Sequence, residues 1–202
     1  MGQDEKIQEI LNYWFGETLE GGAVGPERQR LWFEKVPDVD KEITSKFQGD
    51  LEKAKSGDYS AWSQEPAGCS ALILLLDQFS RHIYRDTPEM FAQDSQALRT
   101  CLRGLERGYD RSLGVVQRVF FYMPMMHSEN IQIQEKCLTF LSIVAKEAEE
   151  KDWEFIDEAL DLSIKHRDVI ERFGRFPHRN SALGRESTEE ELAFLAEPDT
   201  GF

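Results

Sequence analysis

The sequence has little of several features that assign proteins to familiar classes. Cysteine occurs three times, at Cys69, Cys101 and Cys137, and the odd number and wide spacing predict neither a disulfide framework nor a zinc-binding CxxC pair. No apolar run approaches the roughly 18 residues that a membrane-spanning helix needs, and the first residues carry no signal-peptide pattern. We therefore expect a soluble, cytoplasmic protein with reduced thiols and no contact with membranes.

Basic residues are also in deficit. The 202 residues include 24 Lys and Arg against 38 Asp and Glu, which gives a formal net charge of −14. Nucleic acids and anionic membranes attract proteins mainly through Lys and Arg. The charge therefore excludes both as general partners of this chain.

The motifs of common cofactor and metal chemistry are absent too. The chain contains no P-loop, no GxGxxG fingerprint, no GxSxG elbow and no HExxH pair. Its four histidines have no recognised metal-ligand spacing, and each cysteine stands among apolar residues. We expect neither a bound metal nor a cofactor, and no cysteine nucleophile.

Apolar residues recur at helical spacing along nearly the whole chain, whereas strand signals are scarce. This periodicity predicts an all-α fold. Among the later helices, we expect three at about 115–122, 129–150 and 152–173, the first of them stopped by Pro124. Ser187 is expected to cap a last short helix through a capping box.

The order of the helices also predicts how they pack. Short turns between successive helices favour antiparallel neighbours, as in bundles and α-solenoids, and leave the architecture beyond that open. The chain shows no repeat of fixed period and no break in composition. We therefore expect residues 1–202 to form a single domain.

Three charged residues follow the most hydrophobic run of the chain. Asp77, Arg81 and Arg85 are spaced i, i+4 and i+8, which places them on one side of a helix. In one interpretation Asp77 pairs with Arg81, and the arginines complement the negative end of the helix dipole. In the other, the row lines a cleft in which the guanidinium groups bind an anionic ligand. The sequence leaves both interpretations open.

A second candidate lies where two of the predicted helices join. His127 and Glu129 follow the segment MPMM, and a histidine near a carboxylate can act as a general base, a hydrogen-bond donor or a metal ligand. The structural alternative is a histidine packed at a helix end. In that case Ser128 caps the next helix and Glu129 lies in its first turn.

The most unusual segment is residues 172–185, which we call the basic loop. Four of the 24 basic residues lie in it together with His178 and no acid, which leaves 20 basic against 38 acidic residues elsewhere. Two glycines and a proline prevent a continuous helix. The loop either neutralises the acidic helices or completes an anion-binding site in which Arg175, Arg179 and Arg185 bind carboxylate or phosphate.

Several segments of the chain resemble the signature blocks of the DUF924 family. The three long ones are LDQFSRHIYRDTPEMFAQD at 76–94, MPMMHSE at 123–129 and RFGRFPHRNSALGRESTEEE at 172–191. YWFG at 13–16 and the terminal Gly201-Phe202 also fit. The resemblance therefore covers essentially the whole chain, with its blocks in the family's order.

The resemblance implies an all-helical fold similar to that of the tetratricopeptide-repeat superfamily, built from stacked antiparallel helix pairs without a readable repeat consensus. It implies no substrate, cofactor or catalytic residue, because the biochemical role of the family is unassigned. Ser80 stands where the family usually has proline, and His82 where it usually has asparagine. These departures put in doubt only a role for residue 82.

Two functions from different classes follow from these residues. The leading hypothesis is a binding module whose cleft holds an anionic small molecule or an acidic peptide end. Its expected ligand-binding residues are Asp77, Arg81, Arg85, His127, Arg175, His178, Arg179 and Arg185. The alternative is a hydrolase or lyase in the same cleft, with His127 or His178 as general acid or base, oriented by Glu129 or Asp77.

A purely structural or protein-interaction role is the third possibility. It predicts that Arg175, Arg179 and Arg185 are buried in pairs with carboxylates and leave no open pocket. The sequence indicates no oligomeric state.

Overall fold

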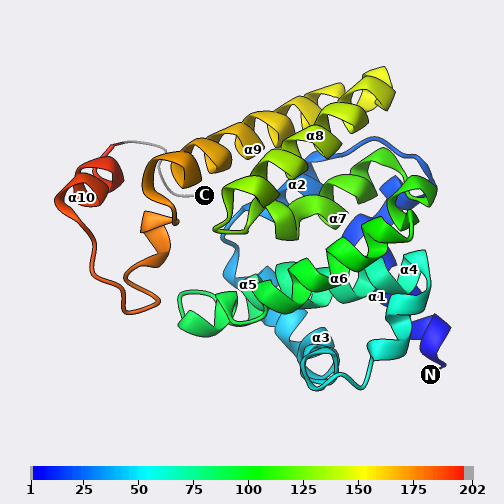
Figure 1. The fold of residues 1–202 in the computed structure, drawn as a ribbon. Helices are drawn as coiled ribbons and strands as arrows, with labels where there is room; N and C mark the ends of the chain where they lie inside the picture. The colour runs from blue at the N-terminus through cyan, green and yellow to red at the C-terminus, as the bar shows by residue number, and fades with distance from the viewer. Residues whose placement is uncertain (1, 198–202) are drawn as a thin grey trace.

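The computed structural model describes residues 2–197, so the terminal Gly201-Phe202 of the family resemblance lies outside the described residues. Within that range every regular element is a helix, which confirms the all-α prediction (Figure 1). No helix between residues 2 and 197 is both long and apolar enough to cross a membrane.

Of the first three α-helices, two begin at prolines and two are followed by a glycine C-cap. Pro26 and Pro37 occupy first-turn positions, where the missing N–H costs no hydrogen bond. Gly57 ends the third helix in the left-handed conformation, with φ of +90°. The elements are α1 (Gln3–Phe15), η1 (Gly16–Glu20), α2 (Pro26–Phe33), α3 (Pro37–Ser56) and η2 (Ser60–Gln64).

The central segment is the most completely buried part of the fold. Every side chain from residue 68 to residue 80 is buried. This stretch begins in α4 (Pro66–Ile73), continues as a π-helical turn, η3 (Leu74–Phe79), and ends in α5 (Ser80–Ile83). π-helical turns are rare and often occur at functional sites. Asp77 lies within this one.

Longer helices dominate the second half of the chain. Their bounds are η4 (Pro88–Phe91), α6 (Asp94–Glu106), η5 (Tyr109–Ser112), α7 (Val115–Met126), α8 (Ile131–Glu147), η6 (Glu150–Asp152), α9 (Trp153–Phe173), η7 (Pro177–Arg179) and α10 (Glu189–Leu195). Successive helices pack as antiparallel neighbours: α7 lies against α8, and α8 lies against α9 (Figure 1). α6 packs against α4 and α7, while α1 and α3 cover the other side of the central segment. The closer likeness to tetratricopeptide repeats stays a prediction.

Three local predictions were wrong, two of them because a contact from elsewhere in the fold outweighs a local signal. Pro124 lies inside α7, where every side chain from residue 118 to residue 126 is buried, and this packing offsets the hydrogen bond that proline cannot donate. Asn130, not Ser128, caps α8. Thr188, not Ser187, caps α10, because the Ser187 hydroxyl accepts a hydrogen bond from Asn180.

Two helical glycines provide a matched test of this packing. A Cβ atom on Gly104 in α6 would lie 2.5 Å from Cζ of Phe121 and 2.9 Å from Sγ of Cys69, whereas a Cβ on Gly49 in α3 meets nothing within 4 Å. We expect Gly104→Ala to lower the free energy of unfolding by about 1–3 kcal/mol through overpacking. Gly49→Ala should raise it by about 0.5–1 kcal/mol. Urea unfolding measures both, and equal effects would contradict the close approach of α6 to α4 and α7.

Candidate functional site

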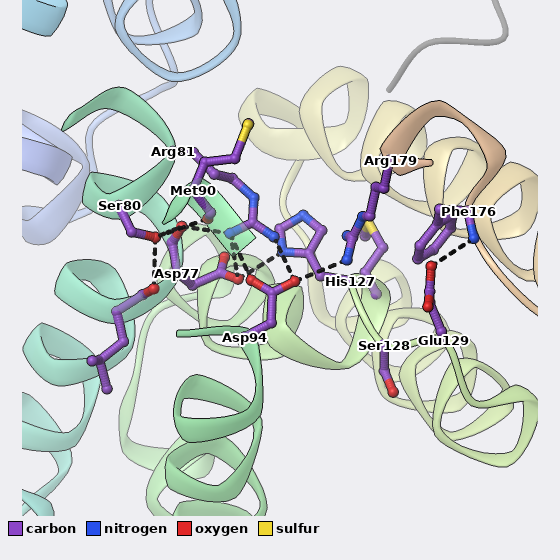
Figure 2. Close-up of polar contacts among 12 residues, drawn as sticks. Asp77, Ser80, Arg81, Met90, Asp94, His127, Ser128, Glu129, Phe176 and Arg179 are labelled. Carbon is purple, nitrogen blue, oxygen red and sulfur yellow. Dashed lines mark hydrogen bonds and ion pairs between the residues drawn. The ribbon is translucent and has the colours of Figure 1, made fainter. Parts of the chain in front are cut away.

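Residues from four distant segments meet in one chain of charges at the centre of the fold. The Arg81 guanidinium lies between two carboxylates, with Nη1 3.3 Å from Oδ1 of Asp77 and 3.1 Å from Oδ1 of Asp94. Asp94 also accepts a hydrogen bond of 2.9 Å from Nη1 of Arg179 in the basic loop. Figure 2 shows this alternation of acid and base, with His127 beside Arg81 and Asp94. The structure therefore brings together Asp77, His127 and Arg179, as the leading hypothesis requires.

Asp77 is the innermost member of this chain, with no solvent exposure. Burial opposes its ionisation, but the charge of Arg81 and the hydrogen bonds from His127 and Gln78 outweigh burial and hold its pKa well below the ordinary value. Its other oxygen accepts a hydrogen bond of 2.5 Å from the side chain of Gln78. Asp77 therefore stays ionised and orients the groups around it.

His127 forms a dyad with Asp77. Nδ1 of the ring lies 2.7 Å from Oδ1 of Asp77. Burial and the nearby Arg81 lower the histidine's pKa, so the ring is neutral at neutral pH. Because an ionised carboxylate only accepts hydrogen bonds, we assign the proton to Nδ1. Nε2 then carries a lone pair and has no hydrogen-bond partner among residues 2–197.

Arg179 is held by stacking more than by hydrogen bonds. Its guanidinium carbon lies 4.6 Å from the ring centroids of both Phe91 and Phe176, and its side chain is 7% exposed. Among residues 2–197 the Arg179 side chain makes one hydrogen bond, to Asp94, and its buried Nε has no acceptor. Burial, partly offset by Asp94, lowers its pKa to about 10. Four of the five guanidinium N–H groups therefore remain free to donate.

Two further histidines lie near His127 and stay neutral. Burial lowers the pKa of His166 to about 3, with His127 adding to the effect, and burial with Arg179 lowers that of His178 to about 4. Nδ1 of His166 lies 2.8 Å from the carbonyl of Leu162. The centroids of the His127 and His166 rings are 6.2 Å apart. Across the described part of the chain, no group of His, Cys, Asp and Glu is arranged to hold a metal ion.

Two cavities lie on either side of these residues. The central cavity, of about 510 Å³, has polar lining from Gln78, Arg81, His82, Arg85, Asp86, His127, His166, His178, Arg179 and Ser181. The side cavity, of about 500 Å³, is lined by Asp94, Ser128 and Glu129. Phe91, His127 and Arg179 line both cavities. Both volumes fall in the range of small-molecule sites.

Three of the predicted arginines are engaged by carboxylates outside this chain of charges. Arg85 follows the end of α5 at Ile83 and binds Asp40 through Nε and Nη2, so it lines the central cavity as one half of an ion pair. Arg175 binds the buried Glu191 in the same two-point fashion and lines neither cavity. These two pairs match the structural interpretation of the basic residues.

Arg185 pairs with the third carboxylate, that of Glu129. Its two terminal nitrogens lie 2.7 and 2.9 Å from the Glu129 oxygens, and the backbone N–H of Phe176 donates to the same carboxylate. Glu129 therefore anchors the basic loop, and Asp77 is the carboxylate that contacts His127. Arg185 lines neither cavity.

Sequence reasoning missed two residues that complete the site. Asp94 joins Arg81 to Arg179, and Phe91 stacks on Arg179. Both lie within the 76–94 block that carries the family resemblance, and their place in this block was the available signal for them. Helical spacing alone could not indicate them, because their partners lie far away in the sequence.

The buried histidines predict how stability depends on pH. In the unfolded chain histidine binds a proton near pH 6.5, whereas folded His166 and His178 bind theirs only near pH 3 and pH 4. Their contribution is complete above about pH 6.5 and is lost as pH falls, because the unfolded state then binds more protons.

His166→Asn, which keeps a donor toward the Leu162 carbonyl, isolates one of these two groups. Below pH 6.5 we expect the variant's free energy of unfolding to fall less steeply, by about 1.4 kcal/mol per pH unit. Urea titrations between pH 4 and pH 8 measure the two slopes. Parallel slopes would show that His166 takes up its proton as easily in the folded protein as in the unfolded chain.

Comparison with known proteins agrees with this fold. A solved structure of a protein of unknown function from Agrobacterium tumefaciens is similar, with 31% sequence identity, a TM-score of 0.81, and coverage of 96% of this chain and 99% of that one. No curated protein matches the chain. The model of the family described as "Bacterial protein of unknown function (DUF924)" matches residues 10–199. The chain therefore belongs to the DUF924 family.

Proposed function

We propose that this protein binds an anionic small molecule in the central cavity, at Arg179 and His127. The observation that carries the proposal is the state of Arg179, a buried arginine with a single hydrogen bond. Buried polar groups in proteins are normally satisfied, and an unsatisfied one often marks a ligand site. An anion with two oxygens matches the free edge of a guanidinium group.

The surroundings of Arg179 support the same function. Phe91 and Phe176 hold the guanidinium between their rings, so the group is already ordered before a ligand binds. The volume of about 510 Å³ suits a small molecule better than a peptide end. The protein's net charge of −14 does not prevent binding, because charges farther than about 10 Å are screened by salt.

The test is ligand-induced stabilisation of the folded protein by inorganic phosphate, succinate, acetate and hexanoate. We expect at least one of these anions to raise the unfolding midpoint saturably, since a hundredfold excess over the Kd adds about 2.7 kcal/mol. Arg179→Gln should abolish this shift. Arg172→Gln is the matched control, because Arg172 is an exposed arginine that pairs with Glu190 and lines neither cavity.

Unfolding midpoints and circular dichroism of the unliganded variants show whether each remains folded. Asp94 keeps Arg81 as a partner when Arg179 is replaced, so we expect Arg179→Gln to fold. A wild-type protein that none of the four anions stabilises would contradict the proposal. Equal stabilisation of Arg179→Gln and the wild type would also contradict it.

The Asp77–His127 dyad favours a second candidate function, a hydrolase or lyase with His127 as general base. A buried carboxylate that fixes the histidine tautomer and leaves Nε2 free is the arrangement by which such a base takes a proton from water or substrate. Arg179 is placed to stabilise developing negative charge. Glu129 takes no part in the dyad, because its carboxylate is bound by Arg185 and Phe176.

Hydrolysis of p-nitrophenyl butyrate tests the hydrolase form. Because the pKa of His127 is lowered, its ring is already in the base form at neutral pH. We therefore expect kcat/KM to be constant near neutral pH and to fall only in acid. His127→Gln should lower kcat/KM by about 10²- to 10⁴-fold. Arg172→Gln should match the wild type. A His127→Gln variant with the wild-type rate would remove His127 from the mechanism.

A further inference from the structure

The central cavity combines its charged wall with an extensive apolar lining. Trp32, Met123, Met126 and Leu162 contribute to it, and Phe33 adds a ring that is 52% exposed. Met90 is a third methionine in the lining. Methionine side chains are flexible and adapt to apolar groups of different shape. A ligand that contacted only Arg179 and His127 would leave this apolar surface against water.

The charges in the wall of the central cavity and of their ion-pair partners balance before any ligand binds. Arg81 and Arg179 line the cavity and carry two positive charges, and their partners Asp77 and Asp94 carry two negative ones. Arg85 and Asp86 also line the cavity and are neutralised separately, by Asp40 and Lys35. An added anion would therefore bring an uncompensated charge into a largely buried site, which is costly.

His127 can supply the one missing positive charge. Nδ1 already faces Asp77, and Nε2 is free to take a proton. The charged and titratable groups that surround it are Asp77 and Arg81 from the central segment, Asp94 from α6, His166 from α9, and His178 and Arg179 from η7. The other three histidines that line the cavity do not compete for this proton at neutral pH. Burial holds the pKa values of His166 and His178 at about 3 and 4, and it also lowers the pKa of His82, whose Nδ1 faces Asp40. One proton balances one negative charge, whereas a dianion would leave one unpaired.

We infer that the ligand is a monocarboxylate with an apolar body, taken up together with one proton. This inference rests on the proposed anion-binding function and specifies its ligand class. The carboxylate binds the free N–H groups of Arg179 and faces His127, and the apolar body lies against the methionines and Phe33. The charge balance disfavours phosphate and dicarboxylates, and the apolar lining disfavours short acids such as acetate.

Isothermal titration calorimetry with butyrate, hexanoate and octanoate, below micelle-forming concentrations, tests whether the cavity binds the apolar body of the ligand. Burial of one methylene contributes about 0.8 kcal/mol, so affinity should rise about fourfold for each added CH₂. Succinate and inorganic phosphate should bind at least tenfold more weakly than octanoate. Phe33→Ser should weaken octanoate binding and leave butyrate binding nearly unchanged. Leu192→Ser is the matched control, since Leu192 is 57% exposed and lies outside both cavities.

The same titrations in Tris and in triethanolamine, two amine buffers with different ionisation enthalpies, measure the number of protons taken up on binding. At pH 7.5 we expect uptake of close to one proton per octanoate bound in the wild type. His127→Gln, whose side chain stays neutral, should show no uptake and weaker binding. Arg179→Gln should lose binding of all three acids, which distinguishes binding in the cavity from non-specific apolar adsorption.

The outcomes separate this inference from the function on which it rests. If octanoate binds no more tightly than phosphate, succinate or butyrate, the monocarboxylate class is wrong while anion binding at Arg179 stands. Binding without proton uptake would overturn the role of His127 as the balancing charge. If no anion binds at all, both this inference and the proposed anion-binding function fail.

Discussion

The ionised carboxylate of Asp77, buried without solvent contact, is the constraint on which the centre of this fold depends. A buried charge is tolerated only when it is paired and hydrogen-bonded. Asp77 therefore requires Arg81 and His127, and the buried part of Arg81 in turn requires Asp94. Asp94 then binds Arg179 and ties the basic loop to the core. One buried charge thus connects the central segment, α6, α7 and the loop that follows α9.

The arginines of the basic loop differ in how far carboxylates neutralise them. Arg175 and Arg185 neutralise Glu191 and Glu129, as a structural loop requires. Arg179 differs from them, because it shares a single carboxylate with Arg81 and stacks between two aromatic rings. The paired arginines hold the loop in place, and this support fixes the position of Arg179, which has unused N–H donors. The structural interpretation therefore applies to Arg175 and Arg185, and the proposed ligand binding concerns Arg179.

Much of the fold follows from local patterns, and the errors have a common cause. Helical periodicity located the helices, and glycine and proline located many of their ends, because these signals act over one or two turns. Pro124 and Ser187 misled because burial of α7 and a hydrogen bond from Asn180 act from elsewhere in the fold. For the site, residue type and spacing indicated Asp77, Arg81, His127 and Arg179. Pairing partners such as Asp40 and Asp94 were not predictable, since they come from other helices.

The sequence by itself determined the helical class, the burial of the central segment, and the unusual concentration of arginine in residues 172–185. These properties depend on periodicity and composition, which are local. Only the tertiary structure decided which arginines are neutralised and which one keeps free donors, because ion pairing depends on distances between residues up to 85 positions apart, as in Arg179 and Asp94. It also decided that His127 faces a cavity with its Nε2 free, because Asp77, fifty positions earlier, takes the other nitrogen.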